Sequence, residues 1–240
     1  MFFWHDSGRL VDRAVTDRWG GVSLGGYEEF NLAAHVGDDP DAVEANRQAL
    51  ALAVKVPRER LVFMNQVHGD RVVVIERPWS APAPPADAVV TRASGLALVV
   101  LVADCVPVLL ADPQAGVVAA VHAGRPGMVA DIVGRVVTTM RGLGARTIDA
   151  IVGPSVCPRC YEVPLAMREE AAAVAPVSAG VSWQGTPAID VAAGVVEQLR
   201  ERDVAVTWLP GCTRERPELY SYREHRQTGR FAGVIVRRER

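Results

Sequence analysis

Lysine and long apolar runs are scarce in this sequence of 240 residues. Lys55 is the only lysine among 26 basic residues, a skew typical of a GC-rich bacterial genome. The longest apolar stretch, 96–110, is interrupted by Asp104, so it is too short and too polar to span a bilayer. The first residues lack the charged-then-apolar pattern of a leader. We therefore expect a cytoplasmic protein without a membrane partner.

Extremes of charge and a dense cysteine framework are also missing. The net charge is −2 and the pI about 6.2, which gives no general attraction to nucleic acid. Four cysteines (105, 157, 160 and 212) could pair, but a chain of this size can bury a core without disulfides. Hydrophobic residues make up 49% of the chain and charged residues 22%, as in soluble globular proteins. We expect reduced thiols, and the sequence assigns no oligomeric state.

The order of the local patterns predicts an α/β protein, a single domain over residues 1–240 with mixed, largely buried sheets packed by helices. Asp39 and Pro40 predict the start of a helix that continues to about residue 54. The proline-rich segment 77–87 is the one candidate linker. Apolar strands resume directly after it, so we interpret it as a surface connection and not as a domain boundary.

Three consecutive apolar, β-branched runs in the centre, 96–103, 106–111 and 117–121, are typical of strands buried on both faces. From Pro126 to Met140 the apolar residues recur at helical spacing, which predicts one amphipathic helix closed by Gly142 and Gly144. The remaining patterns predict strands at 11–19, 61–64, 72–76, 148–152, 204–209 and 232–236, and helices near 164–175 and 190–202, the second capped by Asp190.

Three side chains that can bind metals stand where predicted strands end. His68 follows a strand in NQVHGD, Cys105 breaks an aliphatic run in ADCVP, and His122 closes the run VVAAVHAG. Zinc accepts imidazole and thiolate in a tetrahedral site and can leave its fourth position open. The alternative is two structural histidines and a small buried thiol. The other histidines, at positions 5, 35 and 225, lie in polar surroundings, and we expect them to be solvated.

The helix expected from Pro126 starts beside His122, and its free N–H groups would favour an anion there. Arg125, Arg47 and Gly124 are therefore candidates for contacts with substrate, although a solvated salt bridge is the more common role of a single arginine. Asp104 or Gln66 could handle protons or orient substrate. Burying Asp104 without a partner would cost several kcal/mol, so its position suggests a strand end that opens into a site.

Two further motifs carry weaker signals. CPRC, at 157–160, has the spacing of redox and zinc-knuckle sites, but no second CxxC supplies the missing ligands. We expect a plain loop with thiols, with redox activity as the alternative. The stretch SYREHRQTGRF near the C-terminus is basic and aromatic. A solvated, salt-bridged segment is the favoured interpretation, and an RNA-facing patch is the alternative.

Taken together, the segments resemble one family over nearly the whole chain. GGVSLGGYEEFNLAAHVGDDPDAVEANR, NQVHG, DAVVT, ADCVPVLL, VAAVHAG, IVGPSVCPRCYEV, GCT and SYREHRQTGR occur in the order seen in YfiH-like proteins. That family was described as polyphenol oxidases or laccase-domain proteins and is now described as purine nucleoside phosphorylases. The resemblance implies a layered fold and a zinc ion held by His68, Cys105 and His122.

The resemblance also implies an activity. It predicts phosphorolysis of adenosine, inosine and S-methyl-5′-thioadenosine, with adenosine deamination as a side activity, and purine nucleosides and phosphate as partners. Copper is the less favoured metal, because multicopper chemistry needs far more histidines than the five present.

The sequence departs from the family at one motif. The family usually has HAGWRG, whereas residues 122–127 are HAGRPG, so Arg125 stands one position before the usual arginine and Pro126 replaces it. Because of this departure, the chain could be a degenerate member that binds zinc without turnover. A separate alternative, based on the same site residues, is a cysteine hydrolase that uses Cys105 with His122 as base.

Overall fold

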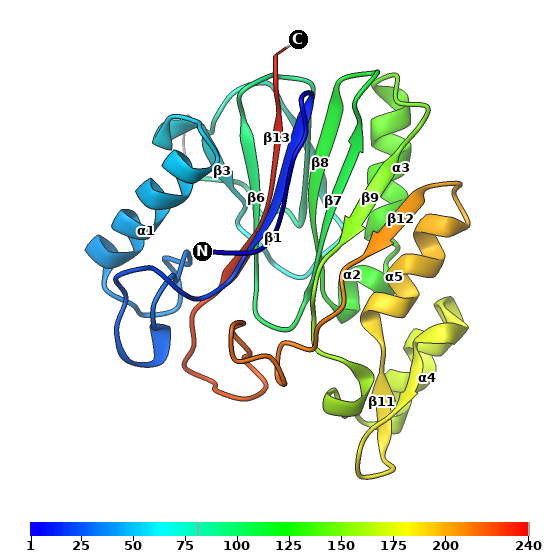
Figure 1. Cartoon of the computed structure of the whole chain (residues 1–240). Coiled ribbons are helices and arrows are strands. Elements are labelled where there is room, and N and C mark those ends of the chain that lie inside the picture. Colours follow the sequence, from blue (N-terminus) through cyan, green and yellow to red (C-terminus); the bar gives the residue numbers. More distant parts are fainter. Residues whose placement is uncertain (81, 240) are drawn as a thin grey trace.

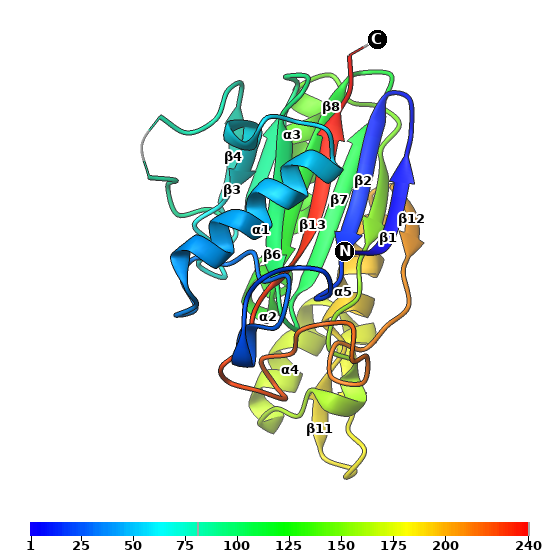
Figure 2. The ribbon, with the colours of Figure 1, turned by 60° about the vertical axis from the view of Figure 1, so that its left-hand side comes forward.

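Two β-sheets stacked face to face form the centre of the molecule, and helices cover both outer faces (Figures 1 and 2). The computed structural model describes residues 1–80 and 82–239. The result is a mixed α/β fold with helix, sheet, sheet and helix layers. The fold class predicted from the sequence is confirmed.

Both large sheets mix parallel and antiparallel strand pairs. The five-stranded sheet has the order β1-β2-β13-β6-β3, with β1 (Phe2–Ser7), β2 (Val11–Thr16), β13 (Phe231–Arg237), β6 (Ala97–Val102) and β3 (Leu61–Phe63). The six-stranded sheet has the order β12-β9-β7-β8-β5-β4, with β12 (Ala205–Trp208), β9 (Asp149–Val152), β7 (Val106–Asp112), β8 (Val117–Ala123), β5 (Ala88–Thr91) and β4 (Val72–Ile75).

The central strands are apolar throughout because each of them contributes to two cores. In β6, Leu98 and Val100 face the space between the sheets, whereas Val99 packs toward α1 (Pro40–Ala53) on the outer face. In β7, Leu109 faces the other sheet and Leu110 faces the helices on the opposite side. Side chains alternate between the two faces of a strand, so burial on both faces requires the uninterrupted apolar runs of the sequence.

The helices lie where the apolar periodicity places them. Asp39 caps α1 by accepting a hydrogen bond from the Asp41 N–H, and Pro40 is its first residue. On the other side of the molecule, α3 (Ile132–Gly142) and α5 (Val191–Arg200) pack on the six-stranded sheet (Figure 1). Asp190 caps α5 through the Ala193 N–H, as expected.

One helix prediction is wrong. The single helix expected from Pro126 to Met140 is two helices, α2 (Arg125–Val129) and α3, separated at Asp131. Asp131 has the left-handed conformation (φ 58°), which an α-helix cannot continue through. Its carboxylate binds the Arg202 guanidinium at 2.5 Å, just beyond the end of α5. Periodicity alone cannot reveal this interruption, because the apolar spacing is kept on both sides of it.

Smaller elements complete the chain. A two-stranded sheet of β10 (Ala179–Val181) and β11 (Pro187–Ile189) lies with α4 (Leu165–Val174) at the bottom right of Figure 1. Four 3₁₀ turns span Gly25–Tyr27, Arg58–Arg60, Pro158–Cys160 and Pro176–Ser178. The sequence patterns did not predict β1, β10 or β11.

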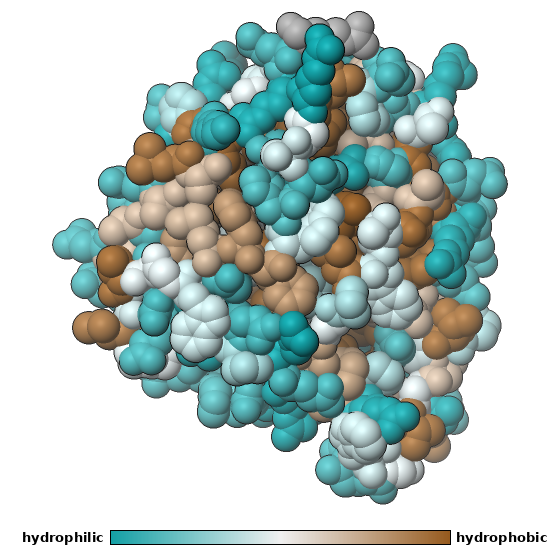
Figure 3. Space-filling model, in the orientation of Figure 1, coloured by the Kyte–Doolittle hydropathy of each residue, from teal (hydrophilic) through white to brown (hydrophobic). Residues whose placement is uncertain are grey.

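The surface carries the polar residues. The face seen in Figure 3 is mostly hydrophilic, with separate hydrophobic patches rather than one continuous apolar band. Among the helices of residues 1–80 and 82–239, none is long and apolar enough to cross a membrane.

Candidate metal centre

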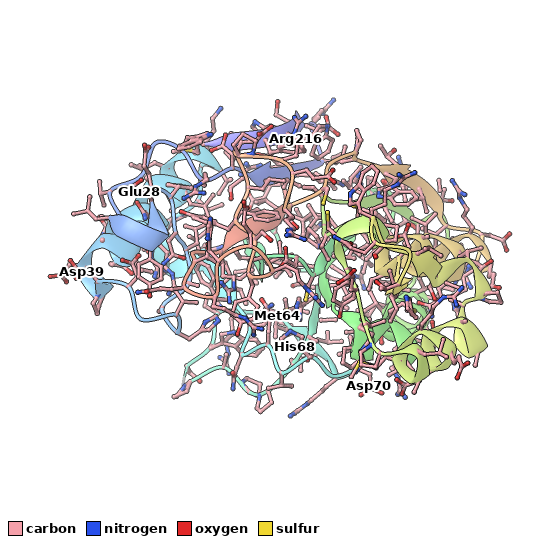
Figure 4. All side chains as sticks on the ribbon, turned by 90° about the horizontal axis from the view of Figure 1, so that it is seen from below. Glu28, Asp39, Met64, His68, Asp70 and Arg216 are labelled. Atoms are coloured by element: carbon pink, nitrogen blue, oxygen red, sulfur yellow. The ribbon has the colours of Figure 1, made fainter. Side chains whose placement is uncertain are left out.

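The structure brings together the three predicted metal ligands. His122 lies on β8, Cys105 lies in the turn between β6 and β7, and His68 lies in the loop after β3. Their ligand atoms all lie within 4.8 Å of one another, and His68 Nε2 is 3.7 Å from Cys105 Sγ. The two imidazole rings meet edge to face, with centroids 4.7 Å apart. Figure 4 places His68 near the middle of the lower end of the molecule.

A buried carboxylate that the sequence analysis did not select fixes two of these ligands. Asp87 Oδ1 lies 2.7 Å from Nδ1 of His122, which leaves Nε2 of that ring free for a metal. The same carboxylate accepts hydrogen bonds from the backbone N–H groups of Val67, His68 and Gly69, at 3.3, 2.9 and 2.7 Å. These bonds hold His68 in the left-handed conformation, with φ 61°. A carboxylate behind a ligating histidine is the usual outer partner of a metal site.

The electrostatics of the three groups favour deprotonation of the thiol. Burial alone would raise the pKa of Cys105, but the neighbouring imidazoles of His122 and His68 lower it to about 6. Burial would lower the pKa of His122, but Cys105 and Asp87 raise it to about 9. Burial likewise opposes ionisation of Asp87, and the hydrogen bonds from His122, Gly69 and His68 outweigh it and lower its pKa. Without metal, the site therefore holds a thiolate beside an imidazolium at neutral pH.

Gly124, which packs against His68 and Cys105, leaves room for these two side chains because it has no side chain of its own. A Cβ on Gly124 would lie 2.9 Å from His68 Cδ2 and 3.3 Å from Cys105 Sγ, so a side chain there would displace both ligands. Two imidazoles and one thiolate are a donor set that zinc accepts, with a fourth position open. The residues present therefore fit a metal ion. The close packing of His68 and Cys105 explains why position 124 is a glycine.

The ligands open into a cleft of about 710 Å³, within the range of small-molecule sites. Arg223, Arg226 and Arg230 line it together with Arg125. Within residues 1–80 and 82–239, none of the first three forms a salt bridge with a carboxylate; Arg230, for example, donates to the carbonyls of Thr228 and Gly229. Their guanidinium groups make this wall of the cleft basic, while the Asp104 carboxylate and the Cys105 thiol lie in the same cleft.

Two residues proposed for proton handling lie in the cleft wall with their polar atoms engaged. The Asp104 carboxylate accepts hydrogen bonds from the hydroxyls of Thr213 and Ser221, both at 2.7 Å, and from the backbone N–H of Arg223 at 2.6 Å. Gln66 bonds the backbone of Leu101 through both ends of its amide, at 2.7 and 2.8 Å. These contacts position the turn beside Cys105 and the end of β6, and a role in proton transfer stays a prediction.

The two arginines selected from the sequence lie differently. Arg125 lines the cleft, but its guanidinium donates to Glu170 at 2.7 Å. Arg47 is not among the residues that line the cleft. It bonds the Leu32 carbonyl and covers the ring of Phe63 at 4.0 Å. Their role in substrate binding stays a prediction.

Two segments that we expected to be solvated, one around His35 and one near the C-terminus, help to line the cleft. His35 lines the cleft, and burial together with the charges of Arg230 and Arg47 lowers its pKa. The basic segment near the C-terminus forms a wall of the same cleft, a role that its sequence did not indicate. The arginines and the tyrosine of this segment indicated a possible binding surface. Where that surface lies depends on the path of the loop before β13, which the sequence does not show.

The expectation that CPRC lacks further metal ligands is wrong. Cys212 and Glu215 come from a distant segment, and their ligand atoms lie within 4.8 Å of those of Cys157 and Cys160. Burial and the neighbouring thiol of Cys212 raise the pKa of Cys157. This is the opposite of the lowered pKa that activates a redox CxxC pair.

A mixed α/β sandwich, with two histidines and a cysteine at one end that could hold a metal ion, defines the class of this protein. Residues 12–238 match the family described as multi-copper polyphenol oxidoreductase laccase, and the chain belongs to that family. The predicted resemblance is confirmed.

Relatives and solved structures agree with this assignment. A purine nucleoside phosphorylase of Streptomyces coelicolor is 55% identical over 226 residues, covering 92% of this chain and 93% of that protein. One of Mycobacterium tuberculosis is 47% identical, covering 94% and 91%. The crystal structure of the Neisseria meningitidis protein NMB0706 superposes with a TM-score of 0.87 at 30% identity, covering 99% of both chains. That of YlmD from Geobacillus stearothermophilus has a TM-score of 0.85 at 27% identity and covers all of both chains.

Proposed function

We propose that this chain is a zinc-dependent purine nucleoside phosphorylase that acts on adenosine, inosine and S-methyl-5′-thioadenosine, with adenosine deamination as a side activity. The observation that carries the proposal is the cleft, in which the His68, Cys105 and His122 ligands face a basic wall. The names of the Streptomyces and Mycobacterium relatives support the reaction class.

Phosphorolysis needs an anion held beside C1′ of the sugar. A bond forms between a phosphate oxygen and C1′ while the bond from C1′ to the purine nitrogen breaks, and the electron pair leaves with the base. Arg223, Arg226 and Arg230 supply positive charge in this cleft, and within residues 1–80 and 82–239 none of them forms a salt bridge with a carboxylate. We therefore assign phosphate to these arginines. Arg125 is a weaker candidate, because Glu170 already neutralises it. The five-residue α2 is too short to supply the expected helix dipole.

A bound zinc ion would act as a Lewis acid and lower the pKa of a neighbouring water, the chemistry that deamination requires. The chain itself does the positioning. Asp87 holds the imidazole of His122 with Nε2 toward the site, and Asp104 fixes the turn that carries Cys105. Among the aromatic residues of the cleft wall, Tyr161 and Tyr222 offer rings that can contact a purine.

The test separates the two reactions by their products. Purified protein is incubated with adenosine, with and without phosphate, and adenine, ribose 1-phosphate and inosine are quantified by chromatography. We expect phosphate-dependent adenine in wild type, a minor amount of inosine, and neither product in His122→Ala. His5→Ala is the matched control, because His5 pairs with Asp12 outside the cleft and its loss should leave turnover unchanged. Metal-loaded wild type without turnover of any of the three nucleosides would instead identify a degenerate member.

The cysteine hydrolase is a second candidate because the pKa of Cys105 is lowered to about 6 beside His122. The two candidates differ in how metal affects the thiol. In the phosphorylase, zinc should protect Cys105 from iodoacetamide and support turnover. In a hydrolase that uses the free thiolate, zinc should inhibit turnover, and the metal-free protein should be the active form.

A further inference from the structure

Cysteine and glutamate side chains from two separate turns meet outside the nucleoside cleft. One turn, Cys157–Cys160, contains the 3₁₀ helix Pro158–Cys160, and the other is Cys212–Glu215. The three Sγ atoms and a carboxylate oxygen all lie within 4.8 Å of one another. In each turn the two potential ligands are three residues apart, the spacing with which zinc knuckles present their ligands.

The distances are close to those of a tetrahedral zinc site. Cys160 Sγ is 3.3 Å and Cys157 Sγ 3.9 Å from Glu215 Oε1. With zinc bonds of about 2.3 Å to sulfur and about 2.1 Å to oxygen, neighbouring ligands are about 3.5–3.8 Å apart. The four groups therefore need to move by less than about 1 Å to share one ion.

The surroundings resemble those of a preformed site. Cys160 and Cys212 are 6% and 7% exposed and pack with Val156 and Tyr161. The backbone N–H of Cys157 donates to Cys212 Sγ at 3.4 Å, an outer hydrogen bond of the kind that steadies metal-bound thiolates. All three cysteines are free thiols in the structure.

We propose that Cys157, Cys160, Cys212 and Glu215 bind a second zinc ion, which has a structural role. All four positions come from protein side chains, which is the closed coordination of structural sites. In Figure 4, Arg216, the residue after Glu215, lies near the upper edge of the view and away from His68. The four residues form a group distinct from His68, Cys105 and His122 and are not among the residues that line the cleft, so the proposal does not depend on nucleoside chemistry.

The ion would link the turns Cys157–Cys160 and Cys212–Glu215. The residues next to these turns support the His68, Cys105 and His122 centre through hydrogen bonds to Asp104. Val156 donates its N–H to the Asp104 carbonyl at 3.0 Å, and Thr213 donates its hydroxyl to the Asp104 carboxylate at 2.7 Å. Val156 directly precedes Cys157, and Thr213 directly follows Cys212. Because Asp104 precedes the ligand Cys105, a zinc ion that joins the two turns would hold this part of the cleft wall in place.

The experiment counts zinc in proteins purified under reducing conditions and exchanged into metal-free buffer. We expect about two zinc ions per chain in wild type, about one in Cys160→Ser and about one in His122→Ala. Arg159→Ala is the matched control, because Arg159 lies in the same turn but covers the ring of Trp183 at 4.3 Å. It should keep both ions.

Cobalt identifies the ligands of the remaining ion. In His122→Ala, bound Co²⁺ should show the strong near-ultraviolet absorption of several thiolates, and the double variant with Cys160→Ser should lose it. Wild type with a single zinc that His122→Ala removes would overturn the proposal. So would a disulfide among the three cysteines in freshly isolated, unreduced wild type.

A milder variant covers the case in which Cys160→Ser does not fold. Glu215→Gln keeps the size of the side chain and removes its charge. It should transfer one zinc to a chromogenic chelator at least about tenfold more readily than wild type, because even outer-sphere partners have effects of about 10–100-fold. Unchanged transfer in Glu215→Gln would contradict the assignment of Glu215 as a ligand.

Discussion

Asp87 joins the two histidine ligands through one carboxylate. It accepts from His122 Nδ1 and from the backbone of the loop that presents His68, and it is fully buried. Metal binding by these residues would therefore depend on a residue that does not itself contact the metal. The reach of the Asp87 carboxylate therefore sets the orientation of one ring and the position of the other.

Replacement of Asp87 tests this positioning role. Asp87→Asn should weaken zinc binding about 10–100-fold, because the amide no longer fixes the His122 tautomer. Zinc affinity is measured by competition with a chelator, alongside unfolding in urea. Asp112→Asn is the matched control, since the Asp112 carboxylate is also buried and accepts four backbone N–H bonds outside the cleft. Both variants should lose about 1–3 kcal/mol of unfolding free energy, but equal loss of zinc affinity in both would contradict a specific role for Asp87.

At the residue scale, the sequence selected the three side chains that the structure brings together, but not Asp87, which supports two of them. His68, Cys105 and His122 could be selected because polar side chains that interrupt or end buried strands need a partner. Asp87 is the last residue of the proline-rich segment and directly precedes a buried strand, which is the same signal in a less obvious place. Arg125 was selected and lines the cleft, but Arg223, Arg226 and Arg230 could not be placed there, because nothing local specifies the path of the loop before β13.

At the scale of elements, a left-handed residue and an ion pair mark the break between α2 and α3. Asp131 reverses the backbone there, and its ion pair with Arg202 connects the break to the end of α5. Both side chains are about one third exposed, so the ion pair itself adds little stability. The left-handed backbone is the larger constraint.

Two substitutions at position 131 separate these contributions. Asp131→Gly and Asp131→Ala both remove the carboxylate, but only glycine adopts a left-handed φ without a steric penalty. We expect Asp131→Ala to unfold at lower urea concentration than Asp131→Gly, by about 1 kcal/mol in free energy. Zinc content should stay at the wild-type level in both. Equal stability of the two variants would mean that the backbone conformation is not the constraint.

Strands buried on both faces were the elements most accurately predicted. The predicted bounds of β6, β7 and β8 lie within two residues of the observed ends. Because these strands are buried on both faces, each one is an uninterrupted apolar run whose ends are easy to locate. The edge strand β1 was missed, since its half-exposed sequence FFWHDS carries no clear period. The strands β10 and β11 are three residues long, too short for any periodicity to show.

For the molecule as a whole, zinc binding should be coupled to proton release. In the metal-free site, the pKa of Cys105 is about 6 and that of His122 about 9. Between these values the thiol has already lost its proton and His122 still carries one, which zinc must displace. From this pair, binding should therefore release about one proton at neutral pH and approach none above about pH 9.

Calorimetric titration in buffers of different ionisation enthalpy measures this proton release. The titration uses Cys160→Ser, so that the His68, Cys105 and His122 centre is observed alone. Apparent zinc affinity should rise about tenfold per pH unit between pH 6 and 9. Affinity that is flat over this interval would show that His122 binds no proton in the metal-free protein or does not bind zinc.

The most direct measurement is ribose 1-phosphate formation from adenosine and phosphate before and after chelation. We predict that wild type forms it, that removal of zinc abolishes it, and that added zinc restores it, in step with the zinc content of the His122 site. Phosphorolysis that continues without metal, or zinc-loaded protein that forms no ribose 1-phosphate, would contradict the account.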